Sequence, residues 1–320
     1  MGFAFAFFPA AGLWTFEDGA ALYAADVIIG LEDGRVAEFD MVGEGAPLLW
    51  FEGGPGLNAS LGRTDVEALP AGRFAGYLIE PPGSGRSTPP PDPLGYGFRQ
   101  QARFYEDVRR VLDLGPVTVF GHSWGGSVAL AFAALFPEAT TRCIAMDPFA
   151  GLAVDDSQEG MSEFQANTRR FASRPWFTAA MRAFEAPAAQ LPDDPVQAGA
   201  CWAPMWPLYF ADPDRADVQV HINRLREEVR VNVRAHRAAD EWAFAEVDLE
   251  PLLPRIACPT LLLAGRYDFV CGPSHARFIA NRLPGASLVV IEDAGHIPSW
   301  ESPARFRDAV QSWLAESGAD

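Results

Sequence analysis

Short apolar runs rich in β-branched residues alternate along most of the chain with longer stretches of helical periodicity. Residues 21–42 predict a β-hairpin, because two such runs flank a turn at residues 32–34. Residues 74–79 predict a strand, and residues 98–114 predict an amphipathic helix. Strands that alternate with helices form a mostly parallel sheet, which binds its ligands at the carboxyl ends of the strands.

The alternation is interrupted once. Helical patterning, prolines and tryptophans fill residues 149–248. We therefore predict a core in two parts, residues 1–148 and 249–320, with a helical cap of residues 149–248 inserted after the sixth strand. Trp202 and Trp206 lie in the most aromatic stretch of this cap. They would either bind a compact apolar group of a ligand or pack the cap onto the core.

The segment Gly121-His122-Ser123-Trp124-Gly125 stands between a strand-like apolar run and the strongly helical residues 128–135. Glycines two positions before and after a serine leave room for a strained strand-to-helix turn that exposes the hydroxyl. The helix that follows would place its N-terminus beside an oxyanion formed at that serine. This context predicts that Ser123 is a nucleophile rather than an ordinary turn residue.

A nucleophilic serine needs a base and an acid, which in this arrangement follow it in the order acid, then histidine. Asp268 comes directly after the buried strand-like residues 259–264, and His296 follows a similar run one helix later. His296 would take the serine proton, and Asp268 would orient the imidazole. Asp147 also follows a strand and is the alternative acid. We expect the side chain of His122 to lie on the opposite side of its strand.

Backbone donors for an oxyanion are predicted at a glycine-rich turn. The run that begins at Pro47 ends in Gly53-Gly54-Pro55-Gly56. The amides of Gly54 and Trp124 are the expected donors, with Gly53 as an alternative to Gly54.

Together these motifs resemble the α/β-hydrolase superfamily, and within it the proline iminopeptidases and the related tricorn-interacting aminopeptidases. The resemblance rests on residues 53–56, 83–89, 121–126, 265–268 and 294–296. It implies a mostly parallel eight-stranded sheet flanked by helices. It also implies removal of an N-terminal residue, often proline, with cap acids that hold the free amine.

Two acidic residues bear on that implied amine site. The resemblance makes Glu241 a candidate for holding the amine. Glu52 stands where the family usually has histidine. An ionised Glu52 would oppose an oxyanion nearby. It would therefore either receive a cationic amine or be held in a structural hydrogen bond behind the loop.

Composition narrows the possible functions. The 320 residues are 49% hydrophobic and 21% charged, which suits a large core. All 25 basic residues are arginine, so lysine Schiff bases and serine–lysine dyads are excluded. The net charge of −17 argues against nucleic acid or anionic membranes as partners. The four cysteines lack metal or redox spacing. We predict no metal, no cofactor and a reducing cytoplasmic location.

The apolar residues 1–12 lack the early positive charge of a signal peptide, since the first arginine is Arg35. We expect them to form an edge strand or to cover the sheet. The rest of the sequence contains no apolar run that is long enough to predict a membrane-spanning helix.

The sequence thus predicts a serine hydrolase whose substrate is a short peptide or another small molecule. An aminopeptidase that releases N-terminal proline or small apolar residues comes first. A carboxylesterase, lactonase or amidase is the alternative, because the same triad serves all of them. A non-catalytic binding protein of this fold would be expected to lack a triad member, and all three are present.

Overall fold

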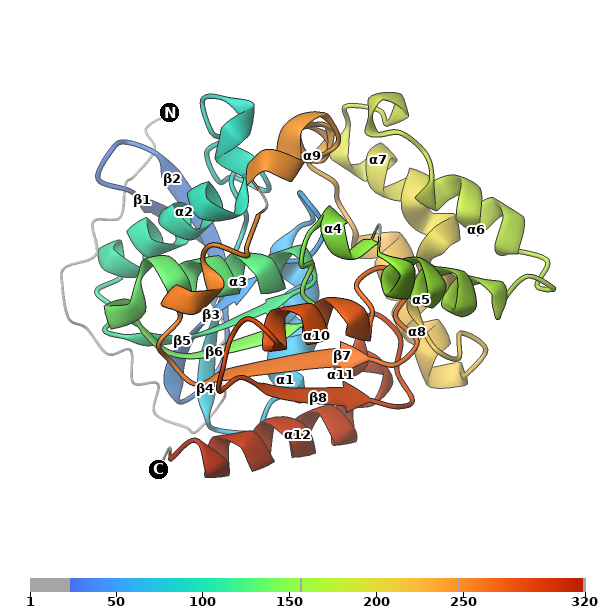
Figure 1. Cartoon of the computed structure of the whole chain (residues 1–320). Coiled ribbons are helices and arrows are strands. Elements are labelled where there is room, and N and C mark those ends of the chain that lie inside the picture. The colour runs from blue at the N-terminus through green and yellow to red at the C-terminus, as the bar shows by residue number, and fades with distance from the viewer. Residues whose placement is uncertain (1–23, 156, 247, 319–320) are drawn as a thin grey trace.

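A computed structural model describes residues 24–155, 157–246 and 248–318 of the protein, so the expectation for residues 1–12 lies outside the described residues. One eight-stranded sheet runs through the molecule in the order β1-β2-β4-β3-β5-β6-β7-β8 (Figure 1). Strands β1 and β2 are antiparallel to their neighbours, and the others are parallel. The strands are β1 (Ala24–Gly30), β2 (Val36–Gly43), β3 (Ala46–Phe51), β4 (Phe74–Ile79), β5 (Val117–His122), β6 (Thr140–Met146), β7 (Thr260–Gly265) and β8 (Ser287–Ile291). The predicted hairpin is confirmed as β1 and β2.

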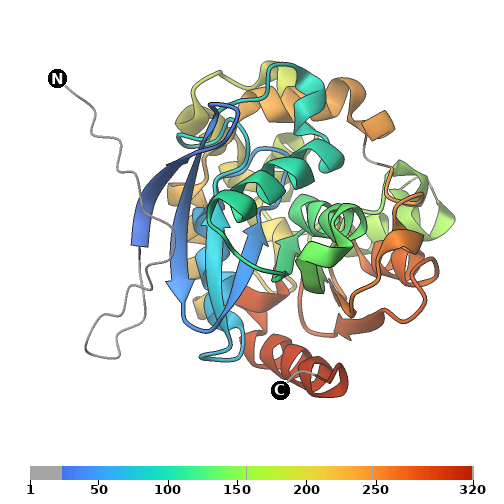
Figure 2. The ribbon, with the colours of Figure 1, turned by 90° about the vertical axis from the view of Figure 1, so that its left-hand side faces the viewer.

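Helices cover both faces of the sheet, and alternate residues of the central strands separate two apolar layers. Val119 of β5 packs into the layer beneath α2 and α3, whereas its neighbour Phe120 packs into the layer beneath α1 and α12. Figure 2 shows the sheet between these helices. Both faces of β5 are buried, as expected for a central strand of a parallel sheet. The helices of the core are α1 (Gly62–Ala68), α2 (Phe98–Val111), α3 (Trp124–Leu135), α10 (Pro273–Ala280), α11 (Pro298–Glu301) and α12 (Pro303–Glu316).

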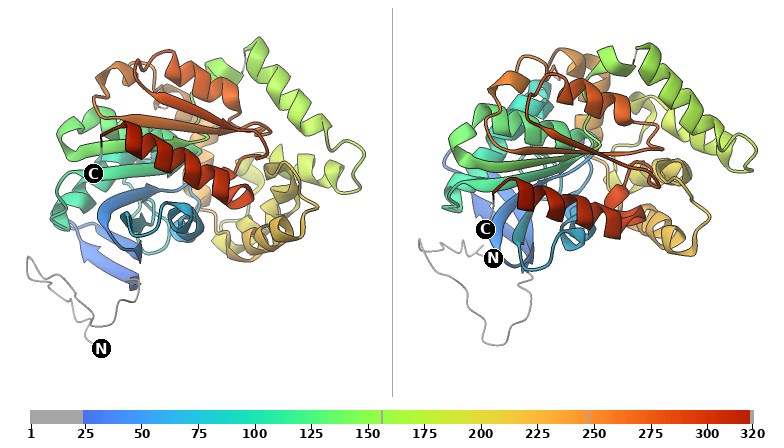
Figure 3. Two further views of the ribbon diagram at one scale, coloured as in Figure 1. Left: turned by 90° about the horizontal axis from the view of Figure 1, so that it is seen from below. Right: turned by 60° about the horizontal axis from the view of Figure 1, so that its bottom comes forward.

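The segment between β6 and β7 is helical and lies beyond the carboxyl ends of the parallel strands, as the two views of Figure 3 show. Its own apolar cluster includes Trp202, Trp206 and Ile222, and it continues onto Phe269 and Trp300 of the core. None of the described helices is long and apolar enough to cross a bilayer. The helices of this cap are α4 (Leu152–Asp155), α5 (Gln158–Arg169), α6 (Phe177–Phe184), α7 (Pro195–Trp202), α8 (Ala216–Glu228) and α9 (Val233–Glu246), with the 3-10 helix η5 (Ala203–Tyr209).

Candidate active site

Ser123 occupies the turn between β5 and α3 in a backbone conformation that few residues adopt. Its φ is 55° and its ψ is −120°, although it is not a glycine. A Cβ on Gly121 would lie 2.0 Å from the carbonyl oxygen of Gly125. A Cβ on Gly125 would lie 2.0 Å from the carbonyl oxygen of Phe51. The two glycines therefore allow the start of α3 to approach β5 and the end of β3, and this approach holds the strained serine in place.

His296 and Asp268 form a buried pair at the ends of β8 and β7. The Nδ1 atom of His296 donates to Oδ2 of Asp268 over 2.7 Å. The other carboxylate oxygen accepts the N–H groups of Val270, at 2.7 Å, and Cys271, at 3.2 Å. Burial alone would raise the pKa of Asp268, but the His296 charge and these hydrogen bonds outweigh it and lower that pKa. Asp268 is thus held ionised, which leaves Nε2 of His296 as a proton acceptor.

The cap covers His296 with an aromatic residue that sequence reasoning did not single out. The carbonyl oxygen of Tyr209 accepts the His296 N–H over 2.7 Å, and its ring centroid lies 5.2 Å from the imidazole. Trp206 packs behind Tyr209 at 5.2 Å, and Trp202 lies one ring further away, 6.2 Å from Trp206. The two tryptophans therefore belong to the apolar cluster of the cap. Tyr209 lies in the same aromatic stretch of the sequence as the two tryptophans, and this position could have marked it as a residue near the site.

Ser123 is 7% exposed beneath the cap. Within the described part of the chain, its hydroxyl makes no hydrogen bond to His296. Catalytic hydrogen bonds are often long without a substrate and tighten when the reacting complex forms. The thiol of Cys271 is a neighbour of this hydroxyl, and burial, followed by the negative charge of Asp268, raises its pKa well above the ordinary value. Cys271 is therefore a protonated thiol beside Ser123.

His122 packs against His296, so the expectation that it points away from the site is wrong. The two ring centroids lie 4.7 Å apart, and Nε2 of His122 donates to the carbonyl oxygen of His296 over 2.6 Å. Because a carbonyl oxygen only accepts, Nε2 of His122 must carry a proton. Burial, followed by the nearby His296, lowers the pKa of His122 to about 3. His122 is thus a neutral support for the loop that carries His296.

Asp147, the alternative acid, lies in the same buried cluster but does not hold His296. Its Oδ1 accepts the N–H of Gly265 over 2.8 Å, and its buried Oδ2 has no conventional donor among the described residues. Burial raises the pKa of Asp147 well above its ordinary value, and the neighbouring charge of Asp268 raises it further. Asp147 is therefore a neutral carboxyl group beside the charged Asp268.

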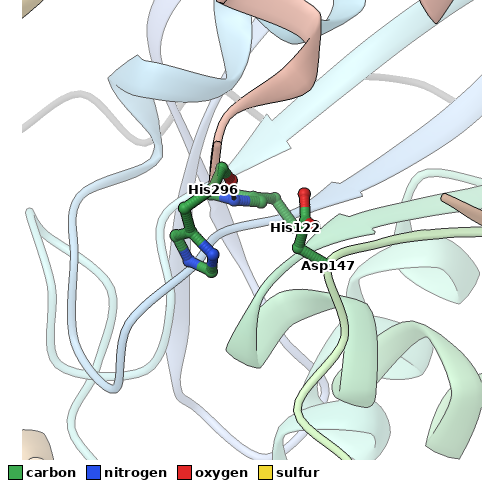
Figure 4. A group of neighbouring side chains, drawn as sticks. All are labelled: His122, Asp147 and His296. Atoms are coloured by element: carbon green, nitrogen blue, oxygen red, sulfur yellow. Dashed lines mark hydrogen bonds between the residues drawn. The ribbon is translucent and has the colours of Figure 1, made fainter. Parts of the chain in front are cut away.

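His122, Asp147 and His296 (Figure 4) are also the described group that could offer ligand atoms to a metal ion. One such atom from each lies within 4.8 Å of the others. The Nε2 atom of His122 and the Nδ1 atom of His296 are, however, engaged in the hydrogen bonds given above. These hydrogen bonds account for one ring nitrogen of each histidine, and burial holds Asp147 neutral. We therefore describe the cluster as a hydrogen-bonded network.

The loop after β3 contains the glycines whose amides are the predicted oxyanion donors. Gly54 adopts φ +58°, and the N–H of Gly53 is taken by Oε1 of Glu52 over 2.7 Å. In the described chain, the N–H groups of Gly54 and Trp124 donate to no protein acceptor. This difference favours Gly54 over Gly53 as the partner of Trp124 at the start of α3.

Glu52 is a buried group of this loop, with an exposed fraction of 4%. Burial raises its pKa well above the ordinary value; the Gly53 N–H opposes this, and the charges of Asp65 and Glu80 add to it. A protonated Glu52 carries no charge that would repel an oxyanion or attract an amine. The burial of Glu52 and its hydrogen bond to Gly53 therefore favour a structural role in the loop over binding of a substrate amine. Glu241 falls in α9, but its side chain lies outside the described residues, so its role stays a prediction.

The residues that meet at the carboxyl edge of the sheet define a class of protein. A strained serine between strand and helix, a buried histidine–aspartate pair and a glycine turn with free amides are the features of an α/β-hydrolase. Comparison with known proteins agrees with this class. The chain belongs to the alpha/beta hydrolase fold family, whose sequence pattern matches residues 45–303. The predicted fold is thereby confirmed.

Individual relatives are distant. An uncharacterized protein of Mycobacterium tuberculosis is 29% identical over 279 residues, which cover 86% of this chain and 77% of the relative. A proline iminopeptidase of Heyndrickxia coagulans is 22% identical over 306 residues, which cover 89% of this chain and 97% of that enzyme. Among solved structures, an alpha/beta fold family hydrolase from Bacillus anthracis superposes with a TM-score of 0.71 at 19% identity, over 92% of this chain and all of that one.

Proposed function

We propose that the protein is a serine hydrolase that works through an acyl-enzyme. The observation that carries this proposal is the buried 2.7 Å pair between His296 and Asp268 beside the strained turn of Ser123. Ser123 would attack a substrate carbonyl while Nε2 of His296 takes the hydroxyl proton. Asp268 would fix the imidazole tautomer and stabilise the imidazolium. The amides of Gly54 and Trp124 would receive the oxyanion.

His296 would then return its proton to the leaving group, which completes acylation of Ser123. A water molecule activated by the same imidazole would attack the ester and release the acid. The protonated state of Asp147 suits this cycle. A neutral Asp147 leaves Asp268 as the charged carboxylate of this pair.

For the substrate we propose a peptide with an N-terminal proline or small apolar residue, from which that residue is removed. The motifs shared with proline iminopeptidases support this proposal, as does the relative of that name, which matches along nearly its whole length. The ring of Tyr209, which is only partly buried and lies 5.2 Å from the imidazole, offers an apolar surface next to His296. Such a surface suits a proline ring.

A carboxylesterase, lactonase or amidase acting on a small acyl compound is the second candidate, and specific observations favour it. An amine site needs ionised acids. Glu52 is buried in its loop and hydrogen-bonded to Gly53. On α8, Glu228 pairs with Arg224 over 2.7 Å. Of the acids considered from the sequence, Glu52 is therefore not an amine ligand, and Glu228 already has a cationic partner.

The two candidates are separated by comparing kcat/KM on a proline arylamide, an N-blocked proline arylamide and p-nitrophenyl butyrate. A strong preference for the free-amine proline compound would support the aminopeptidase. Activity confined to the ester, or indifferent to N-blocking, would support the esterase. The Ser123→Ala variant is the control and should lose activity on every substrate. If Ser123 also fails to react with a fluorophosphonate probe, the protein is not a serine hydrolase.

A further inference from the structure

A cavity of about 500 Å³ lies at the junction of core and cap, on the side of the oxyanion loop. The core contributes Asn58, Gly83 and Ser84, and the cap contributes residues at and before the start of α9. This side of the site is formed by β3 and β4, whereas the acid and the histidine follow β7 and β8 on the other side of β5. The cavity is therefore separate from the histidine–aspartate pair described above.

The charge of the cavity is opposite to that of the whole protein. Its charged lining residues are Arg230, Arg234, Arg237 and Asp193, three cations against one anion, in a chain of net charge −17. Asp193 neutralises Arg237, with which it pairs over 2.7 Å. Among the described residues, no carboxylate pairs with Arg230 or Arg234. Two positive charges therefore remain for a ligand.

The wall of the cavity is fixed by Asn232. Its backbone N–H donates to the carbonyl oxygen of Gly56 over 2.7 Å, which ties it to the oxyanion loop. Its Oδ1 accepts the N–H of Arg234 over 3.2 Å, and its Nδ2 donates to Pro82 over 3.3 Å. Two separate segments, at Gly56 and at Pro82, thus hold one position, and a bond to the start of α9 orients the side chain. A ligand here would meet a preorganised surface and would order few side chains on binding.

Hydrogen bonds also fix both the main chain and the guanidinium group of Arg230. Its N–H donates to Oδ1 of Asn58 over 2.7 Å. One terminal nitrogen, Nη1, donates to the carbonyl oxygens of Glu227, at 2.7 Å, and Val229, at 3.0 Å. The guanidinium therefore has a fixed place and keeps further donors for a ligand, because an arginine carries five N–H groups.

Ser84 provides an observation independent of the charges. It lines the cavity, is 94% buried (6% exposed), and its hydroxyl has no partner among the described residues. A buried hydroxyl without a partner costs free energy unless a ligand or water satisfies it. The start of α9 beside it adds the partial positive charge of a helix N-terminus.

A second cavity, of about 350 Å³, has a different character. It lies against α5 and the loop after Asp268, and its charged carboxyl groups are Asp155 and Glu163. Aromatic residues, among them Phe164 and Phe269, make up much of its wall. Carboxylates in such a wall would repel an anion. Only the arginine-lined cavity of the two offers cations.

We propose that the arginine-lined cavity is a binding site for the anionic group of a small ligand, a carboxylate or a phosphate. Arg230 and Arg234 pair with the anion, and the hydroxyl of Ser84 donates a hydrogen bond to it. Arginine suits this task because its planar donors match the oxygens of both groups. The proposal stands apart from the reaction, since binding is measured whether or not the protein hydrolyses any substrate.

Isothermal titration calorimetry of the full chain with inorganic phosphate and with succinate, at constant ionic strength, tests the proposal. We expect saturable binding of at least one probe at millimolar concentration. Tighter binding of phosphate would identify a phosphate-bearing ligand, and tighter binding of succinate a carboxylate-bearing one. No saturable heat with either probe would overturn the proposal.

Variants locate the binding. Arg230→Gln together with Arg234→Gln should weaken it about tenfold or more, because two charge-assisted contacts are lost. Ser84→Ala removes only the hydroxyl and should weaken binding by a smaller factor without disturbing the fold. Arg226→Gln removes one exposed positive charge on α8, outside the cavity, so it controls for a general loss of charge and should bind as the wild type does. Equal weakening by Arg226→Gln, or none by the cavity variants, would show that the anion binds elsewhere.

Discussion

The carboxyl ends of β6 and β7 lie side by side and each carries an aspartate, yet the two differ in charge. Asp147 and Asp268 both follow a buried parallel strand, and both are fully shielded from solvent. Asp268 is held ionised by His296 and two backbone N–H groups, whereas Asp147 receives one N–H, from Gly265. Burial is thus the same for both, and the charge of His296, together with the larger number of donors, keeps Asp268 ionised.

The backbone after each strand explains the number of donors. The chain after Asp268 turns back, so that the N–H groups of Val270 and Cys271 point at its carboxylate. Asp147 adopts φ +47° and is followed by Pro148, which has no N–H to offer. A residue after a strand therefore becomes the charged member of this pair only when its own loop supplies donors.

The largest expected effect is that of Asp268→Asn. An amide at this place cannot hold His296 in the tautomer that accepts the serine proton, and we expect kcat to fall roughly 10³–10⁴-fold. Steady-state kinetics on whichever substrate the wild type hydrolyses measures this. Near-normal activity of the variant would transfer the role of triad acid to Asp147.

Other buried carboxyls should resemble Asp147 rather than Asp268. Burial raises the pKa of Asp65 to about 7, although the Ser299 hydroxyl hydrogen-bonds to it. Burial, aided by the charge of Glu38, also raises the pKa of Glu80 to about 7. Between their ordinary values near pH 4 and about pH 7, the folded state keeps protons that the unfolded state has lost. Stability from these groups is therefore full at low pH and declines as the pH rises through about 7.

This decline can be measured as a change in Tm. For each group we expect a loss on the order of 1–2 kcal/mol between about pH 5 and about pH 8, which is a few degrees in Tm. Asp65→Asn and Glu80→Gln cannot titrate and should show a shallower decline. A wild-type Tm that rises across this range, with the same slope in the variants, would contradict the assigned protonation states.

Asp147→Asn should have a smaller effect on activity. An amide is a neutral replacement of similar shape for a protonated carboxyl, and its oxygen can still accept the Gly265 N–H, so we expect kcat to stay within about tenfold of the wild type. The pH–rate profile is the more telling measurement, because the lower limb should keep its position. Loss of activity as severe as that of Asp268→Asn would mean that the two aspartates act as equals.

Glu52→Gln should have the smallest effect. The glutamine oxygen can accept the Gly53 N–H as the glutamate oxygen does, and no charge is lost from a group that is already neutral. We expect kcat/KM within about threefold of the wild type. A rise in KM confined to substrates with a free amine would instead assign Glu52 to amine binding.

Much of the fold and part of the site could be predicted from the sequence. The alternating pattern predicted the hairpin, the parallel strands and the helices, because periodicity and glycine positions act within a few residues. The turn at Ser123 was predicted for the same reason: Gly121 is needed for a contact within that turn, although Gly125 also allows the approach to the end of β3, which only the folded structure shows. The chain order of Ser123, Asp268 and His296 was sufficient to propose them together.

Tertiary structure decided the rest, because the remaining properties depend on segments that are distant in sequence. His122 contacts His296, 174 positions away, and Asn232 contacts Pro82, 150 positions away. Such contacts explain three features: the neutral state of Asp147, the placement of Tyr209 over His296, and the grouping of arginines around one cavity. Sequence determined which chemical groups the protein has. The folded chain determined which of them are charged, which are covered and which meet.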